Sequence, residues 1–279
     1  MLLISTAKHT LEELLKVRGY VDGYELGIGS VEHNRMLCSV LGGSILTIHN
    51  LPALMPGEEA FMMEPAADPK PAAKMATKMI KRMENMLGSW SVYGVHAGLR
   101  GKIKGPSDFT IKGNLLPFEK CLENIRTFCE LMRNVARHGS LAVENIYGAD
   151  ERSPAVGADE NELLLLSRVV PLLLDRGHLA VNCAYRSVPL ESLNLKGLRI
   201  AELHVSFLHP KIKDFTPESL RAAPIFWDHH PYTDTPVNRQ ILNMASQLIN
   251  ETQLIVAEVS GTPEETRQTL EKLFFARSR

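Results

Sequence analysis

Short apolar runs recur along this chain, and most of them are followed by a segment that carries helix signals. We predict strands at residues 2–5, 23–28, 44–49, 90–96, 141–145, 178–184, 198–204 and 253–258. The helix signals include a capping box that begins at Thr10 and Thr-Pro pairs that begin at Thr216, Thr235 and Thr262. Strands that alternate with helices pair in parallel. Eight such units in 279 residues predict an α/β protein, a (β/α)8 TIM barrel that forms a single domain over residues 1–279.

The composition narrows the class of protein and of partner. A net charge of −1 gives no strong field toward nucleic acid or membrane, although a local basic groove stays open. The chain has no run of about 18 apolar residues, so we expect no membrane partner. Its first residues contain neither a basic stretch nor a long apolar one, and its four cysteines form no CxxC motif. We therefore expect no signal peptide, reduced thiols and a cytoplasmic location.

Residue types that bind metals stand at the ends of the predicted strands, where the functional groups of a TIM barrel lie. The set, with two residues from the connection after the seventh strand, is His49, His96, Glu144, Asn182, His204, Asp228, His230 and Glu258. One such residue alone is usually a solvated side chain or a helix cap. Here the strand ends converge on one mouth, and Glu144 and Glu258 end buried runs where an unpaired charge is costly. We therefore predict a divalent metal site, with an ion pair to a basic residue as the alternative.

The mixture of imidazole and carboxylate also limits the identity of the metal. Nitrogen and oxygen ligands together suit Zn or Mn, with Fe as a further candidate, whereas Ca prefers oxygen alone. Three or four histidines with three carboxylates exceed the needs of one ion, so two or three ions with a bridging carboxylate are the simpler count. Such a cluster activates water near neutral pH and holds the charged oxygens of a phosphate ester.

The sixth strand has two alternative placements. The preferred one, at 178–184, puts Asn182 and Tyr185 at the mouth of the barrel. The rival uses Asp175-Arg-Gly-His178, which supplies better metal ligands but leaves little chain after Asp159 for both a helix and a strand.

Two connections are candidates for a functional role. The segment from Gly98 to Pro117 is rich in Gly and Lys, and we name Arg100, Lys102 and Lys104, together with Tyr185 after the sixth strand, as substrate contacts. The alternative for this basic segment is an ordinary solvated surface. The Pro-rich segment at 50–71 is too long for a plain connector and is more typical of a functional loop.

The ordered motifs resemble those of a known family. They are Thr47-Ile-His49, Tyr93-Gly-Val-His96, Val143-Glu144-Asn145, Leu203-His204, Asp228-His229-His230 and Ala257-Glu258. Together they resemble the xylose-isomerase-like barrel superfamily and, within it, the endonuclease IV branch. That resemblance implies phosphoester hydrolysis at a di- or trinuclear centre, with Glu144 and Glu258 as catalytic residues.

The resemblance also implies a distribution of ligands. Glu144 would bridge two ions, one held by His49 and His96 and the other by His204 and Glu258. Asp228 and His230 would hold a third ion. The sequence departs from the family where it has Asn182 in place of an Asp-x-x-His motif, which weakens one metal position.

Other functions stay open at this point. A single ion between Glu144, His204 and Glu258 would suit isomerisation or epimerisation of a sugar or sugar phosphate. Glu202-Leu-His204 is also similar to a motif of the multinuclear iron-dependent oxidases, and a metal-binding barrel without turnover is a further alternative. We expect a phosphorylated or sugar-like substrate. DNA is one candidate, although only the segment from Arg100 to Lys112 supplies a basic surface.

Overall fold

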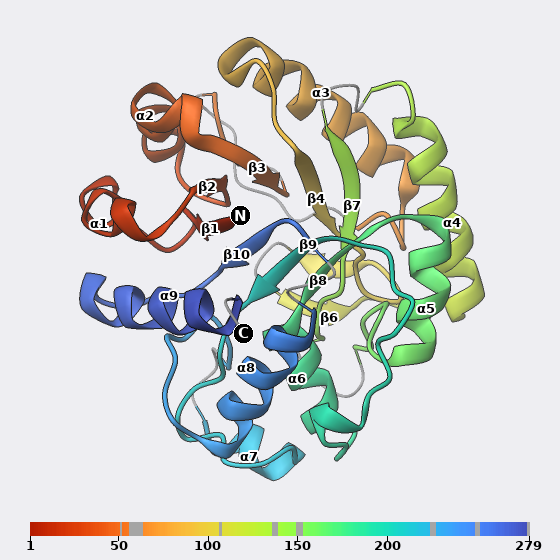
Figure 1. The fold of residues 1–279 in the computed structure, drawn as a ribbon. Coiled ribbons are helices and arrows are strands. Elements are labelled where there is room, and N and C mark those ends of the chain that lie inside the picture. Colours follow the sequence, from red (N-terminus) through yellow and green to blue (C-terminus); the bar gives the residue numbers. More distant parts are fainter. Residues whose placement is uncertain are drawn as a thin grey trace.

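Eight parallel strands close into a barrel, which confirms the predicted (β/α)8 fold (Figure 1). The computed structural model describes residues 1–50, 52–55, 64–105, 108–135, 139–148, 153–223, 227–248 and 252–277. Around the barrel the strands follow the order β1-β10-β9-β8-β7-β4-β3-β2, so neighbours in the barrel are consecutive barrel strands along the chain. Their bounds are β1 Leu2–Ser5, β2 Gly23–Leu26, β3 Ile45–His49, β4 Val92–His96, β7 Ser140–Glu144, β8 Leu172–Asp175, β9 Ile200–Val205 and β10 Ile255–Ala257.

Helices surround the barrel (Figure 1). They are α1 Leu11–Val17, α2 Val31–Leu41, α3 Pro69–Leu87, α4 Phe118–Met132, α5 Glu160–Val169, α6 Arg176–Tyr185, α7 Pro217–Arg221, α8 Pro236–Leu248 and α9 Pro263–Arg277, with short 3-10 turns at η1 Arg18–Tyr20, η2 Gly42–Ser44 and η3 Leu190–Ser192. Their starts follow the capping signals of the sequence. Thr10 and Glu13 form the expected capping box, and the Thr216 hydroxyl accepts a hydrogen bond from the Ser219 N–H.

The interior of the barrel changes character along its axis. Its lower layer is an apolar cluster of Leu3, Val92, Ala142, Leu173, Leu254 and Val256. Side chains two residues apart on a strand point to the same face, so the positions that follow this layer also face the interior. On β7, Glu144 stands two residues after Ala142, and on β8, Asp175 stands two residues after Leu173, so each carboxylate lies on the same face as the apolar residue before it. The apolar layer thus supports a charged layer at the carboxyl ends of the strands.

The sixth strand of the barrel differs from our preferred prediction. The predicted strand at 178–184 is wrong, because these residues belong to α6, and the strand is β8 at Leu172–Asp175. Pro171 has no N–H group to donate, and α5 ends before it, at Val169. The apolar run that follows is typical of a parallel strand buried on both faces, and four residues are enough for it. Asp175 then begins α6, since its carboxylate accepts a 2.6 Å hydrogen bond from the His178 N–H.

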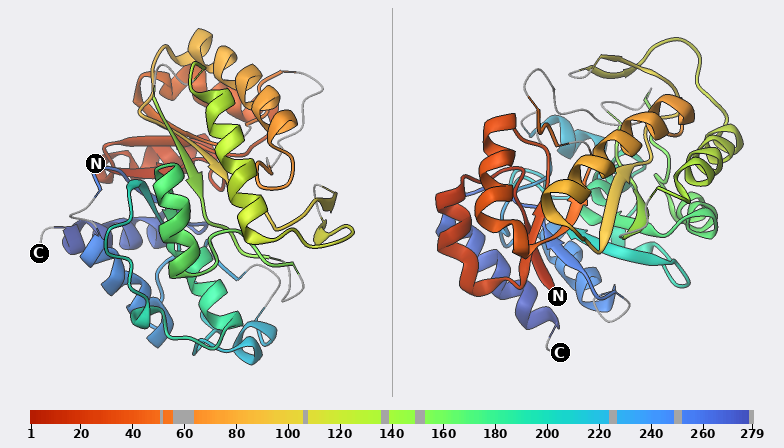
Figure 2. Two further views of the ribbon diagram at one scale, coloured as in Figure 1. Left: turned by 90° about the vertical axis from the view of Figure 1, so that its right-hand side faces the viewer. Right: turned by 90° about the horizontal axis from the view of Figure 1, so that it is seen from above.

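One element was not predicted. The segment after β4 forms an antiparallel hairpin of β5 Ile103–Gly105 and β6 Asp108–Ile111. The hairpin projects on the side of the barrel opposite the chain termini (Figure 2, left). An isolated bridge between Leu99 and Ala155 ties its base to the segment after β7. Much of the long loop predicted at 50–71, residues 51 and 56–63, lies outside the described residues. Among the described helices, none has the length and apolar character to cross a membrane.

Candidate metal centre

A first group of ligand-type residues lies at the ends of β3, β4 and β7. The Oε2 atom of Glu144 is 2.5 Å from Nε2 of His49 and 2.8 Å from Nε2 of His96. The side-chain amide of Asn50 lies beside both rings, 2.9 Å from His49 and 3.1 Å from His96. All four residues are buried. The first group therefore presents two imidazole nitrogens and one carboxylate oxygen toward one point.

A second group shares Glu144 with the first. It consists of Glu144, Asp175, His204 and Glu258, whose ligand atoms lie within 4.8 Å of one another. Nδ1 of His204 is 2.9 Å from Oε2 of Glu258 and 3.7 Å from Oε1 of Glu144. Oε1 of Glu144 and Oδ2 of Asp175 are buried without a hydrogen-bond partner. Unpartnered buried carboxylate oxygens are costly unless a cation is bound, so this group fits a divalent ion.

A third group lies beyond the second and consists of His178, Asp228 and His229. Oδ2 of Asp228 is 3.1 Å from Nε2 of His178 and 3.4 Å from Nε2 of His229. The hydroxyl of Tyr147 donates a 2.9 Å hydrogen bond to the other oxygen of Asp228. His178 also lies 3.5 Å from Oε1 of Glu144, which connects the third group to the others.

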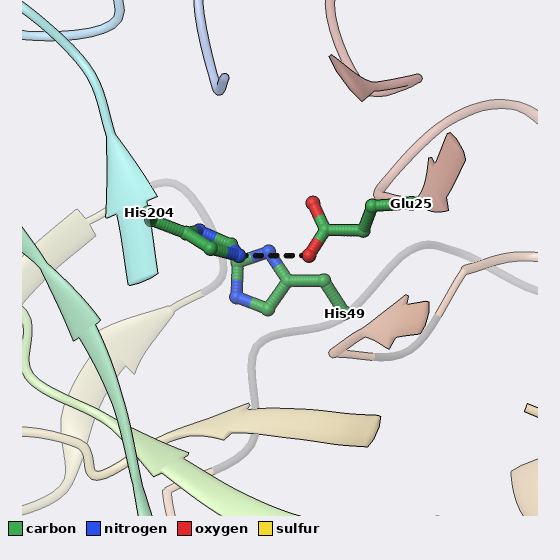
Figure 3. Close-up of side chains that lie close together, drawn as sticks. All are labelled: Glu25, His49 and His204. Carbon is green, nitrogen blue, oxygen red and sulfur yellow. Dashed lines mark hydrogen bonds and ion pairs between the residues drawn. The ribbon is translucent and has the colours of Figure 1, made fainter. Parts of the chain in front are cut away.

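Two buried glutamates also belong to the centre. The sequence analysis missed Glu25 and noted Glu202 only in the motif similar to that of the iron-dependent oxidases, not as a site residue. Glu25, near the end of β2, and Glu202, on β9, both lie against Nε2 of His204, at 2.8 Å and 3.2 Å (Figure 3 shows Glu25 with His204 and His49). Both are fully buried. The signal was present in the sequence: each is a carboxylate inside a short apolar strand, and Glu202 shares a face with His204 two residues later.

The electrostatics of the centre follow from these contacts. Burial is the largest single influence on the pKa of His49 and lowers it, but the charge and hydrogen bond of Glu144, together with the charges of Glu25 and Glu258, raise it to about 9. Burial raises the pKa of Glu144, yet the charges of His49 and His96 hold it well below its usual range. Burial dominates at Asp175, where it raises the pKa to about 6. The proton on His49 thus partly neutralises the centre where a metal ion would otherwise do so, whereas burial lowers the pKa of His96.

The sequence left two explanations for the buried Glu144 and Glu258, a divalent metal site or an ion pair with a basic residue. The observed partners of the two carboxylates distinguish between them. In the described part of the chain, the ion pairs of Glu144 and Glu258 are all with histidines, and none is with lysine or arginine. Mixed imidazole and carboxylate donors are the ligands of Zn, Mn and Fe. The donor set therefore fits a divalent transition metal better than a structural ion-pair network.

Three residues predicted near the centre lie differently from the expectation. Asn182 is on helix α6, and its amide donates to the Ile146 carbonyl at 2.9 Å, so Asp175 and His178 occupy the place we assigned to it. The hydroxyl of Tyr185, at the end of the same helix, donates to the Gly148 carbonyl.

His230 is the third of these residues. It forms an antiparallel bridge with Phe207, and its ring lies 4.8 Å from that of His209. His229 joins the third group in its place: its backbone is left-handed, with φ of 59°, and its Nε2 atom lies 3.4 Å from Oδ2 of Asp228.

The basic residues of the predicted substrate loop are engaged with the protein. Arg100 forms an ion pair with Glu162 and lies 5.4 Å from the ring centre of Phe118. Lys102 lies 2.6 Å from a carboxylate oxygen of Asp68. Lys104 is exposed on β5. Substrate contact by Arg100, Lys102, Lys104 and Tyr185 stays a prediction.

Several solved structures share the fold of this chain. No family model and no curated protein matches this chain. Among solved structures, a xylose isomerase domain containing protein from Salmonella typhimurium matches with a TM-score of 0.62 and 14% identity over 100% of this chain and 97% of that one. A D-tagatose 3-epimerase-like protein matches with a TM-score of 0.59 and 12% identity over 99% and 98% of the two chains.

A third solved structure belongs to the same set. It is the probable 3-DHS dehydratase AsbF of Bacillus anthracis, with a TM-score of 0.60 and 14% identity over 98% of each chain. At such identities the likeness shows the fold alone, a TIM barrel. The endonuclease IV branch that the motifs resemble is not among these three structures.

Proposed function

We propose that this protein is a divalent-metal-dependent enzyme that moves a proton on a small, polyhydroxylated, sugar-like substrate, as isomerases, epimerases and dehydratases do. The observation that carries the proposal is the second group, Glu144, Asp175, His204 and Glu258, which converges at the carboxyl ends of four strands. Similar barrels described as epimerases and as a dehydratase support the reaction class. We also propose that the chain belongs to the xylose-isomerase-like superfamily, which the sequence motifs resemble.

The roles follow from the charge and position of each group. A divalent ion held here would act as a Lewis acid on a substrate carbonyl or hydroxyl oxygen. The charges of neighbouring histidines keep the pKa values of Glu144 and Glu258 low, so both carboxylates are ionised and able to accept a proton. Asp228, which is fixed by His178 and Tyr147, is placed to orient a substrate hydroxyl.

The test combines metal content with a sugar assay. The purified protein is loaded with Mn, Co, Zn or Mg and incubated with a panel of ketoses, aldoses and their phosphates, and products are separated by chromatography. We expect turnover that Glu144→Gln and Glu258→Gln reduce by at least about 100-fold. Glu264→Gln, which alters an exposed carboxylate on α9, should leave it unchanged. A protein that binds metal but converts no member of the panel would refute the reaction class.

A second candidate is phosphoester hydrolysis at a multinuclear centre of the endonuclease IV kind. It is favoured by one specific observation: Glu144 belongs to both the first and the second group, and the third group lies beside them. This arrangement offers ligands for two or three ions. Elemental analysis combined with incision of DNA that contains apurinic sites separates the candidates. Two or more ions with incision favour hydrolysis, whereas sugar turnover without incision favours the first proposal, and iron with colour would point to oxidation instead.

A further inference from the structure

His204 is held by carboxylates at both ring nitrogens. Its Nδ1 atom faces the second group, 2.9 Å from Glu258, whereas its Nε2 atom faces Glu25 at 2.8 Å and Glu202 at 3.2 Å. The ring and both of these last two glutamates are fully buried. No surrounding water competes for these contacts, so they determine how the ring is protonated and oriented.

The two glutamates reach His204 from different parts of the barrel. Glu202 stands two residues before His204 on β9, so the two side chains share a face of that strand. Glu25 comes from β2, which is separated from β9 by β1 and β10 in the barrel order. Figure 3 shows its carboxylate pointing across the interior toward the His204 ring. The β2 backbone is fixed by the hydrogen bond that the Thr6 N–H donates to the Glu25 carbonyl.

The chemistry of imidazole then assigns the two nitrogens. A neutral ring carries one N–H and one lone pair, and only the lone pair can bind a metal. An ionised carboxylate can only accept, so a nitrogen that faces Glu25 at 2.8 Å carries the proton. Nδ1 faces Glu258 at 2.9 Å and, by the same argument, carries a proton in the metal-free protein. An ion bound at the second group would displace that proton and take the lone pair on Nδ1, while Glu25 keeps the proton on Nε2. Carboxylates that hold the second nitrogen of a metal-binding histidine in this way fix its tautomer and raise its basicity.

An alternative is that Glu25, His49 and His204 form an ion site of their own, since their ligand atoms lie within 4.8 Å of one another. With the second group also occupied, His204 would have to bind through both nitrogens and lose both protons, which a neutral imidazole does not do. Hydrogen bonding explains the same distances without that cost.

We propose that Glu25, assisted by Glu202, is a positioning residue that holds His204 with its proton on Nε2 and its lone pair on Nδ1, directed to the ion of the second group. This inference rests on the proposed function. Glu25 and Glu202 would thus raise the metal affinity of the second group without binding its ion themselves.

The experiment measures Zn²⁺ affinity and stoichiometry by competition with a chromophoric chelator. The variants are Glu25→Ala, Glu25→Gln and Glu202→Gln, and the matched control is Asp22→Asn, which alters a carboxylate that accepts from the Leu2 N–H on the segment before β2. We expect Glu25→Ala to weaken the second-group ion by about 10- to 100-fold with unchanged stoichiometry. Glu25→Gln keeps an oxygen acceptor and should lose less. Far-UV circular dichroism checks that each variant is folded.

A second readout responds to the hydrogen bond of the Nε2 proton and not to stability. In the zinc-loaded protein, long-range ¹H–¹⁵N spectra should show His204 with a bound Nδ1 and a protonated Nε2, whose proton is shifted downfield and exchanges slowly in wild type and Glu25→Gln and exchanges faster in Glu25→Ala. Equal zinc affinity in folded Glu25→Ala and wild type would overturn the proposal. Loss of one whole ion from Glu25→Ala would also overturn it, because Glu25 would then be a ligand. If the wild type binds no ion at all, the proposed function itself fails.

Discussion

The pairing of Glu144 with His49 should make the metal-free protein unusually sensitive to alkaline pH, whereas the pKa of His96, the other imidazole beside Glu144, is lowered by burial. The perturbation is Glu144→Gln, which removes the charge that these two imidazoles face at 2.5 Å and 2.8 Å while it nearly conserves volume. In the folded protein His49 has a pKa of about 9 against 6.5 for the free side chain. A histidine with a raised folded pKa contributes stability that is fully present below pH 6.5 and lost as pH rises through about 9.

The magnitude follows from that shift. A difference of about 2.5 pKa units at about 1.36 kcal/mol each corresponds to roughly 3 kcal/mol from His49 in the metal-free protein at pH 6. Glu144 itself has a depressed pKa, so its contribution is present above pH 4.5 and lost only at acid pH. Glu144 contributes most to the raised pKa of His49, ahead of Glu25 and Glu258, so Glu144→Gln should remove most of this roughly 3 kcal/mol from the free energy of unfolding at pH 6 and much less at pH 9.5 and above.

The assay is urea unfolding, followed by circular dichroism, with a chelator present throughout. The chelator is needed because a bound ion stabilises the folded state by mass action and would mask the effect. Glu264→Gln serves as the control for a lost surface carboxylate. An equal difference in the free energy of unfolding between wild type and Glu144→Gln at pH 6 and pH 9.5 would show that the charge of Glu144 does not stabilise protonated His49, and would refute the prediction.

Three further predictions concern single positions. Asp175→Asn should reduce metal affinity at least about 10-fold in a chelator competition, whereas Asn182→Ala should leave it within about 2-fold; the reverse result would restore the other placement of the sixth strand. His229→Ala should lower the number of ions per chain, or their affinity, more than His230→Ala does, and elemental analysis with zinc titration compares the two. Gly94→Ala should destabilise by about 1–3 kcal/mol in thermal or urea unfolding, because its Cβ would meet a leucine methyl of β8 at 2.4 Å; an unchanged midpoint would contradict the close packing of the barrel interior.

The misplaced sixth strand shows where local reasoning fails. Pro171 follows the end of α5, and the strand is the next four residues, Leu172–Asp175, but a run of four residues carries no periodicity that separates it from the helix before it. The placement at 178–184 is favoured from the sequence because it leaves more chain after Asp159 for a helix and a strand. Closure of the barrel determines which run forms the sixth strand. β8 has to pair with both β7 and β9, and in the observed register Asp175 lies opposite His204.

The choice between His229 and His230 was also beyond the sequence. Neighbouring residues in an extended chain point in opposite directions, whereas residues two apart point the same way. The sequence Asp228-His229-His230 therefore favours His230, not His229, as the histidine that binds a metal together with Asp228. The structure instead has a left-handed backbone at His229 and a bridge between His230 and Phe207, and both depend on contacts with a distant strand end.

The sequence by itself determined the eight-unit barrel and most residues of the centre, including His49, His96, Glu144, His204 and Glu258. It could do so because helix caps, apolar runs and the residue at a strand end are local properties, and a TIM barrel brings all strand ends to one mouth. Only the tertiary structure decided which short run forms the sixth strand, which histidine accompanies Asp228, and that Glu25 reaches His204 across the interior. Each of these depends on strand register and barrel closure, which bring residues from distant parts of the chain into contact. A local sequence pattern does not contain the information about such contacts.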